Sequence, residues 1–541
     1  MSSPLLENLY EEQPYKTVFF ILIFLYILTF YLRYFINTTR LPGPVPFPIV
    51  GNFPQLVLLL LREKFNLSQV IQILHLKYGD FFQLYIPFSF RDPVIVISNA
   101  QIVEPLFAST SAIENKFHLR TGPRQGINEL GISKKGLYLN RDTESWIRNK
   151  NFFVHGVGSV NAAKDCVVYA SKAFEEMEKS WVEVGSFIGK RDLIAKVDLI
   201  EWIFRWTTDI IFQVTLSENV NSIQTYKKII IEKTSNNEKK SNLNSSFNKL
   251  AKSLSVTRMS IDTETFIRNM QNFFPAVWIF LATPKWTRDY VAPVSTMARQ
   301  FKTSLEVVNK ALVKIIKKKR EEISGGKAKE GWMDFLTTMI TAEEDKVVFS
   351  DDDVRENLLH ALAGGIITLG NTLCFIIYTI TKHPNVKNQL MQEIDSVFKE
   401  NDILNYEDLA KLKYTEAIIK EALRILPTVP LNLRVAGEDC RIGEHQFKAG
   451  TQFILNQQGI HLNPKHWENP TEFDPSRFLS PNSDKNMQKN SLLHFGAGTR
   501  KCPGKLLAMT ELKCFLALFY QKYDFVIDNV DMNNNKGEWD D

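Results

Sequence analysis

The ten residues Phe495-Gly-Ala-Gly-Thr-Arg-Lys-Cys-Pro-Gly504 place one cysteine directly before a helical stretch that runs from Lys505 to Tyr520. Glycines in the loop permit a tight turn that other residues resist. A cysteine at the start of a helix, next to an arginine and a lysine, is stabilised as the thiolate. The Cys502 thiolate can therefore serve as a metal ligand or as a nucleophile, and the loop alone is also compatible with an ordinary structural turn.

Three further segments accompany this loop in order along the chain. Trp146-Ile-Arg-Asn-Lys150 comes first, Glu421-Ala-Leu-Arg424 lies much later, and Phe473-Asp-Pro-Ser-Arg-Phe478 directly precedes the loop region. With the loop, these segments resemble the W-x-x-x-R/K, E-x-x-R, P-x-R-F and F-x-x-G-x-R-x-C-x-G elements of the cytochrome P450 family. The E-x-x-R pair alone is a weak signal, whereas four elements in this order are not expected by chance. The resemblance covers most of the chain.

The resemblance implies a haem-thiolate enzyme whose cofactor is haem b. It implies that Cys502 is the axial ligand of the haem iron and that its sulfur donates electron density to the metal. Glu421 and Arg424, one helical turn apart, can form a fork-type ion pair, and the resemblance extends this pair to Arg477 as a structural network that holds the loop. Other positions that match cofactor contacts of the family are Trp146, Lys150, Arg434, His461, Phe495, Arg500 and Gly504.

The chain departs from the family at Ala363-Gly364-Gly365-Ile366-Ile367-Thr368. Family members usually carry an acid and a threonine after the glycine, and this pair relays protons to bound oxygen. Ile366 and Ile367 occupy those two positions and cannot donate or accept a proton. We therefore expect Thr368 to deliver protons if the helix bulges at the glycines; a threonine that bonds back to its own helix is the alternative.

The spacing of apolar residues predicts a mainly α fold with a minor β part: a P450-like helical haem domain behind an N-terminal transmembrane helix. Helical patterns run from Asp198 to Leu216 and from Val294 to Ile323. A longer helix begins at Ser350, where Asp353 completes a capping box, and stops before Pro384. Alternating stretches predict a small sheet formed by Phe82 to Tyr85, Val94 to Ile97, Cys440 to Phe447 and Gln452 to Leu455.

Composition narrows the classes of protein. The 541 residues carry 65 Lys+Arg and 60 Asp+Glu, a net charge of +5 that is too small to indicate a nucleic-acid partner. Hydrophobic residues make up 44% and charged residues 23%, which excludes a wholly disordered chain. The five cysteines form no C-x-x-C pair, which argues against a disulfide scaffold or a cysteine zinc site and favours a reducing compartment.

The N-terminal region 1–40 contains an apolar run at about 17–36 that is long enough to span a membrane. Positive charge after the run favours a cytosolic body. A stiff, proline-rich hinge at 41–52 comes next, then a catalytic domain at 53–528 and a polar tail at 529–541. We expect a single-pass protein of the endoplasmic reticulum in contact with membrane lipid.

The leading functional interpretation is a monooxygenase that inserts one oxygen atom from O2 into a lipophilic small molecule, with electrons from NADPH delivered by a reductase. Ile366 and Ile367 favour an alternative, a haem-thiolate hydroperoxide isomerase, dehydratase or peroxygenase that needs no proton relay. A second alternative is a haem- or lipid-binding membrane protein without turnover.

Overall fold

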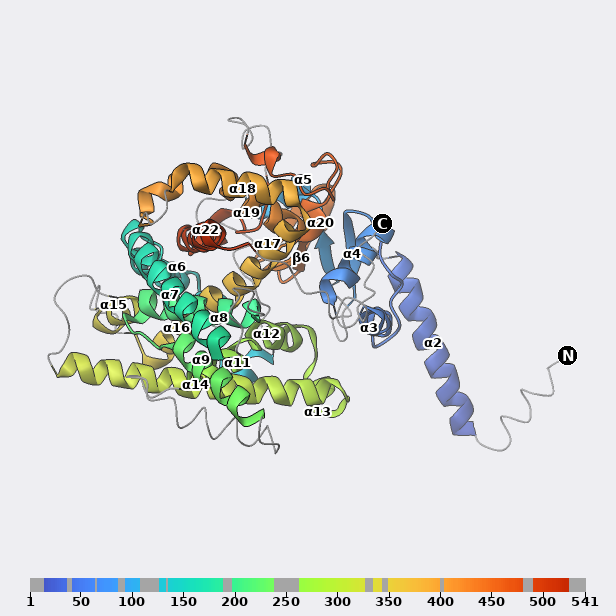
Figure 1. Ribbon diagram of the computed structural model, residues 1–541. Helices are drawn as coiled ribbons and strands as arrows, with labels where there is room; N and C mark the ends of the chain where they lie inside the picture. The colour runs from blue at the N-terminus through green and yellow to red at the C-terminus, as the bar shows by residue number, and fades with distance from the viewer. Residues whose placement is uncertain are drawn as a thin grey trace.

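The computed structural model shows a mainly helical body with a small β-sheet at one side and a single helix, α2, that projects away from the body (Figure 1). The predicted fold class is confirmed. The structure describes residues 14–36, 41–63, 66–85, 93–107, 126–132, 135–187, 197–237, 262–325, 334–342, 349–398, 403–479 and 490–524. The polar tail predicted at 529–541 lies outside these residues.

The helices account for most of the described chain. The longer ones are α2 (Pro14–Ile36), α3 (Phe53–Arg62), α4 (Leu67–Tyr78), α6 (Thr143–Gly156), α7 (Val160–Phe187), α8 (Leu199–Leu216), α9 (Ser222–Asn237), α11 (Thr263–Met270), α12 (Phe273–Ala282), α14 (Val294–Ser324), α16 (Asp351–Ala363), α17 (Leu369–Lys382), α18 (Pro384–Val397), α19 (Lys413–Ile425) and α22 (Lys505–Lys522). The short ones are α5 (Ala100–Val103), η1 (Glu104–Leu106), η2 (Gly126–Leu130), α13 (Lys285–Tyr290), α15 (Phe335–Thr341), η4 (Gly364–Thr368), η5 (Tyr406–Ala410), α20 (Gln457–His461), η6 (Pro475–Phe478) and η7 (Gly498–Arg500).

Helices α7, α8 and α22 pack together at the centre of the main apolar core. The indole of Trp206 on α8 donates a hydrogen bond to the Ala170 carbonyl of α7 at 3.1 Å, and its ring lies 5.0 Å from that of Phe515 on α22. Tryptophan is buried here at little cost because its N–H has a partner. These contacts fix α22, the helix that begins directly after the cysteine loop.

The long helix predicted from Ser350 is confirmed, with one change in its middle. Ser350 caps α16, and Asp353 accepts the return hydrogen bond of the capping box. The helix then passes through the π-helical turn η4 into α17 and ends before Pro384. Together α16, η4 and α17 are long and apolar enough to cross a membrane, but most of their surface is buried in the body. They form a core helix.

The sheet has four strands in the order β1-β2-β6-β3: β1 (Phe81–Leu84), β2 (Val94–Ile97), β6 (Gln452–Asn456) and β3 (Leu431–Val435). Strands β2 and β6 are parallel, and the outer pairs are antiparallel. A separate hairpin joins β4 (Cys440–Ile442) and β5 (His445–Phe447). The alternating stretches predicted all but β3, although its sequence Leu-Asn-Leu-Arg-Val alternates in the same way.

The hinge is docked onto the body at β1. The Gln83 N–H donates to the Pro42 carbonyl at 2.9 Å, and a side chain at Gly43 would meet the Gln83 carbonyl oxygen at 2.3 Å. The Asn52 side chain accepts from the Tyr85 N–H at 2.7 Å and donates to the Pro44 carbonyl. Hydrogen bonds therefore hold the hinge against the sheet, so it does more than separate α2 from the body.

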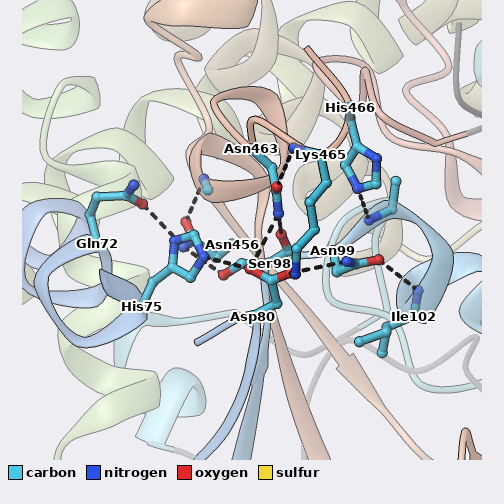
Figure 2. Close-up of polar contacts among 12 residues, drawn as sticks. Gln72, His75, Asp80, Ser98, Asn99, Ile102, Asn456, Asn463, Lys465 and His466 are labelled. Atoms are coloured by element: carbon cyan, nitrogen blue, oxygen red, sulfur yellow. Dashed lines mark hydrogen bonds and ion pairs between the residues drawn. The ribbon is translucent and has the colours of Figure 1, made fainter. Parts of the chain in front are cut away.

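A polar network ties this sheet region to the segment after α20 (Figure 2). The Asp80 carboxylate accepts hydrogen bonds from His75 at 2.9 Å, Lys465 at 2.8 Å and Asn99 at 3.1 Å. The hydrogen bond from His75, helped by Lys465 and Asn99, holds the pKa of the Asp80 carboxyl well below its usual value, although burial opposes the shift. One carboxylate thus joins three parts of the chain.

We expect Asp80→Asn to lower the free energy of unfolding by about 2 kcal/mol at neutral pH, because hydrogen bonds to a charged group are lost. An aspartate with a lowered pKa stabilises the folded state above its usual pKa, and this contribution is lost as the pH falls toward the folded value. Denaturant unfolding at several pH values should therefore show the difference shrinking in acid. Asp439→Asn, which removes an exposed pair with Lys448, should change stability little; equal effects of the two variants would contradict the role of the network.

Candidate active site

One cavity connects the cysteine loop with the middle of the long helix. Its polar and titratable lining residues include Lys150, His360, Thr368, Cys502 and Glu511. The remainder is mainly apolar. The apolar lining residues include Leu137, Phe153, Val157, Ile211, Phe273, Phe274, Leu369, Leu423, Val429, Leu507 and Leu512. The arrangement suits a large apolar group that carries a few charged substituents.

The cysteine loop is built by backbone geometry. Gly496 and Gly498 adopt φ of 70° and 65°, a left-handed conformation that favours glycine. The Cys502 N–H donates to the Phe495 carbonyl at 2.8 Å and closes the turn. Gly504 then occupies the N-cap of α22, so Cys502 lies beside the positive end of that helix. Cys502, Phe495 and Gly504 all line the cavity.

A cluster of cations forms another part of the wall. The Arg500 guanidinium stacks on Trp146 at 3.9 Å from the ring centroid and donates to the Asn140 carbonyl at 2.8 Å. Lys150 Nζ donates to the Thr499 carbonyl at 2.9 Å. Burial, together with Lys501 and Arg500, lowers the pKa of Lys150. Crowded cations at a cavity favour an anionic group such as a carboxylate.

Arg434 and His461 do not line the cavity, in contrast to the other predicted cofactor contacts. Arg434 is buried on β3, where it donates to the side chain of Asn432, itself a lining residue. His461 is fully buried, and its Nε2 accepts from the Leu493 N–H at 2.7 Å. Burial lowers the pKa of His461 to about 3, an effect reinforced by Arg424. In the described structure His461 is thus a buried acceptor that holds the chain before the cysteine loop, and its role as a cofactor contact remains a prediction.

The E-x-x-R residues form a fully buried bidentate pair. Arg424 Nε donates to Glu421 at 2.7 Å and Nη2 to the other carboxylate oxygen at 2.8 Å. The remaining Arg424 donors bind the carbonyls of His461, Pro470 and Glu472. Arg477 lies 3.3 Å from the Glu421 carboxylate. The network joins α19 to the segment before the cysteine loop, which is the arrangement that the resemblance implied for these three residues.

The π-helical turn changes which side chains face the cavity. Gly364, Gly365, Thr368 and Ala361 line the cavity, whereas Ile366 and Ile367 are not lining residues and belong to the apolar core. A side chain at Gly365 would meet Ile211 of α8 at 2.5 Å, so this glycine permits close helix packing. A π-turn adds a residue to the helix and rotates the side chains beyond it. Thr368 lines the cavity at the bulge expected at the glycines. Ile366 and Ile367 do not line it.

Thr368 also bonds back to its helix, since its hydroxyl donates to the Gly364 carbonyl. Both interpretations of this residue therefore apply in the described structure: it lines the cavity, and it is a back-bonding threonine. Farther along α17, Thr372 donates to the Thr368 carbonyl and contacts the Thr428 hydroxyl, each at 2.6 Å. Thr372 and Thr428 also line the cavity.

His360, His494 and Glu511 also line the cavity and were not predicted from the sequence. His360 accepts from the Tyr138 N–H at 3.3 Å and lies among the rings of Tyr138 and Phe273. Glu511 is a lone acid within an apolar stretch of α22, which was a signal available in the sequence. The two histidines carried no such signal, because only the fold brings them to the cavity.

The donor set fits haem. A cysteine sulfur at a helix start supplies an axial ligand, cations with a stacked indole suit two propionates, and apolar walls suit the macrocycle. Among the described residues, no group of three His, Cys, Asp or Glu side chains offers an alternative site for a bare metal ion. The site is therefore typical of the haem-thiolate class of proteins.

Comparisons with known proteins agree with this class. The family model described as Cytochrome P450 matches residues 41–540. The chain is 25% identical over 496 residues to "Aromatase 3" of Sus scrofa, covering 90% of this chain and 83% of that protein. It is also 25% identical to "Aromatase" of Homo sapiens, covering 82% and 75% of the two chains, and to "Cytochrome P450 3A6" of Oryctolagus cuniculus, covering 90% and 85%. The chain belongs to the cytochrome P450 family, and it is a monooxygenase of the oxidoreductase class.

Proposed function

We propose that this protein inserts one atom of O2 into a lipophilic small molecule, using electrons that a reductase takes from NADPH. The observation that carries the proposal is that Cys502 and Thr368 line one largely apolar cavity. A ligand for the iron and a hydroxyl for the oxygen site thus belong to the same space. The apolar and aromatic lining favours a substrate with little charge.

The chain's own residues provide binding and orientation. Bound haem b supplies the iron at which oxygen is reduced and activated. Cys502 is the proposed axial ligand, and Trp146, Lys150 and Arg500 are the proposed propionate contacts. Thr368 orients water and passes protons at the oxygen site, which the largely apolar walls otherwise keep dry.

We propose that α2 anchors the body on the cytosolic side of the endoplasmic reticulum membrane. The apolar stretch of α2, Tyr15–Ile36, has a mean hydropathy of 2.1 and none of it is buried against the body. Lys501 and Lys505 are exposed near the cysteine loop and offer a surface for an acidic face of the reductase. Such docking weakens with rising salt concentration.

The relay-independent alternatives stay open, because the long helix carries no acid beside Thr368. They rested on Ile366 and Ile367 at the oxygen site, and both isoleucines face the core while Thr368 lines the cavity. The test incubates the full-length haem-loaded protein with fatty acids, sterols and terpenes under two conditions. One contains reductase, NADPH and oxygen; the other replaces all three with lipid hydroperoxides. We expect product from the first condition, and product from the second alone would favour the hydroperoxide isomerase.

Thr368→Val should reduce the fraction of NADPH consumption that yields product by about tenfold or more, because a proton-transferring hydroxyl is removed from the oxygen site. The uncoupled electrons should leave as hydrogen peroxide, measured beside NADPH and product. Ile367→Val is the matched control one residue away, and it should leave this coupling unchanged. Equal coupling in Thr368→Val and the unaltered protein would remove Thr368 from proton delivery.

A further inference from the structure

Two amide side chains belong to the wall of the cavity. Asn432 lies on β3 and Gln457 begins α20, and both line the cavity. The rest of the wall is mainly apolar. A polar side chain in such a wall is costly unless it makes hydrogen bonds, because it is withdrawn from bulk water. The partners of each amide therefore show which of its atoms remains for a ligand.

The orientation of the Asn432 amide is set by Arg434. A guanidinium can only donate hydrogen bonds, and Arg434 Nη1 lies 2.9 Å from Asn432 Oδ1. The amide oxygen is therefore next to Arg434, which does not line the cavity. Leu431 and Leu433, on the opposite face of β3, belong to a separate apolar cluster that includes residues of α4. The donor hydrogens on Nδ2 are thus the part of Asn432 left for the cavity.

The orientation of the Gln457 amide is set in the same way. Gln457 Nε2 donates to the Leu493 carbonyl at 2.8 Å, and a carbonyl oxygen can only accept. Gln457 Oε1 is the remaining atom, and it is buried without a hydrogen-bond partner among the residues that the structure describes. A buried acceptor without a donor is costly and rare in native proteins. It indicates a ligand that brings a donor hydrogen.

The donor and the acceptor belong to neighbouring backbone segments. Asn432 pairs with Leu455 in the β3–β6 ladder, and Gln457 follows two residues after Leu455. The Gln457 N–H also donates to the carbonyl of Pro430, two residues before Asn432, at 2.8 Å. Side chains at such diagonal positions on neighbouring segments can contact the same group. The cavity thus offers one donor and one acceptor to the same part of a ligand.

We propose that Asn432 and Gln457 bind a hydroxyl group of the substrate, so that the substrate is a lipophilic alcohol. The hydroxyl oxygen accepts from Asn432, and its hydrogen is donated to Gln457. A ketone or a carboxylate, including a haem propionate, can only accept and leaves Gln457 unpaired. A site built to bind a hydroxyl discriminates against analogues that lack it. This inference rests on the proposed monooxygenase function, whose apolar cavity holds the remainder of the alcohol.

Optical titration of the full-length haem-loaded protein tests the proposal without turnover, because a ligand that enters the cavity changes the haem absorbance. The probes are matched sets on long-chain, terpene and steroid skeletons, each as an alcohol, a ketone and the parent hydrocarbon. Each hydrogen bond should strengthen binding by about fivefold. The alcohol of at least one skeleton should therefore bind about fivefold more tightly than its ketone. Equal binding of alcohol and ketone on every skeleton, or no binding by any alcohol, would overturn the proposal.

Substitutions then identify the two residues. Asn432→Leu should weaken the alcohol and the ketone by about fivefold each, whereas Gln457→Met should weaken the alcohol alone; binding of the hydrocarbon should not change. Gln446→Met is the matched control, since Gln446 is exposed on β5 and does not line the cavity. Asn432→Asp keeps an oxygen for Arg434 and exchanges the donor for an acceptor, so its preference for alcohol over ketone should rise. This last ratio decides the matter even if the leucine or methionine variant loses haem.

Haem retention separates this role from a cofactor contact. Faster haem loss in Asn432→Asp with an unchanged ratio of alcohol to ketone binding would mean that Asn432 binds the cofactor, and the proposal would be wrong. Absence of product with reductase and NADPH would instead reject the proposed monooxygenase. The titrations need neither of these components, so they would still decide whether the two amides bind an alcohol.

Discussion

Glu421→Ala is expected to produce a protein that retains little or no haem. Removal of the carboxylate leaves the fully buried Arg424 without its charged partner, and breaking a buried ion pair in this way costs about 3–5 kcal/mol. Two further contacts are lost, the hydrogen bond from the Asp474 N–H at 2.9 Å and the ion pair with Arg477. The segment that leads to the cysteine loop is then no longer held against α19.

Haem content per folded protein, from absorbance and a pyridine haemochrome assay, measures this effect. Glu407→Ala is the control, because Glu407 forms an exposed pair with Lys164 and such pairs contribute at most about 1 kcal/mol. Haem content of Glu421→Ala equal to that of the control would show that the network does not hold the cofactor site.

Cys502→Ser should abolish thiolate ligation and reduce product formation by about a hundredfold or more, the scale of removing one group that stabilises reacting charge. Serine has nearly the same size but remains a neutral hydroxyl, so it cannot donate electron density as a sulfur anion does. The reduced carbon monoxide spectrum should lose the long-wavelength band typical of thiolate ligation. Because the loop is shaped by its glycines and by the Cys502 N–H, the variant should still fold.

Cys440→Ser provides the matched control, since Cys440 lies on β4 in the small hairpin and does not line the cavity. Its spectrum and activity should equal those of the unaltered protein. A thiolate spectrum retained in Cys502→Ser would mean that another cysteine binds the iron.

Features that depend on local pattern were predictable from the sequence. Periodicity identified the long helix and its Ser350–Asp353 capping box, and alternation identified most of the sheet. The three-residue spacing of Glu421 and Arg424 predicted a pair because residues one turn apart share a helix face. The loop at Cys502 was predicted from the glycines and the helix directly after it. Each of these inferences needs only neighbouring residues.

The rest of the site depends on contacts between distant segments. The π-turn at Gly364–Thr368 brings Thr368 to the cavity and directs Ile366 and Ile367 to the core. A sequence alignment does not show this change in side-chain direction. His461 matched a family position, yet the structure gives it the backbone N–H of Leu493 as its partner. Glu511 is buried because α7 and α17 pack against α22, which its local sequence does not indicate.

The source of the oxygen atom in the product tests the central claim most directly. The full-length haem-loaded protein is incubated with reductase, NADPH, substrate and isotopically labelled O2 in unlabelled water, and the product is analysed by mass spectrometry. We predict one labelled oxygen atom per product molecule. Product that carries no label, or that forms only when lipid hydroperoxide replaces O2 and NADPH, would contradict a monooxygenase.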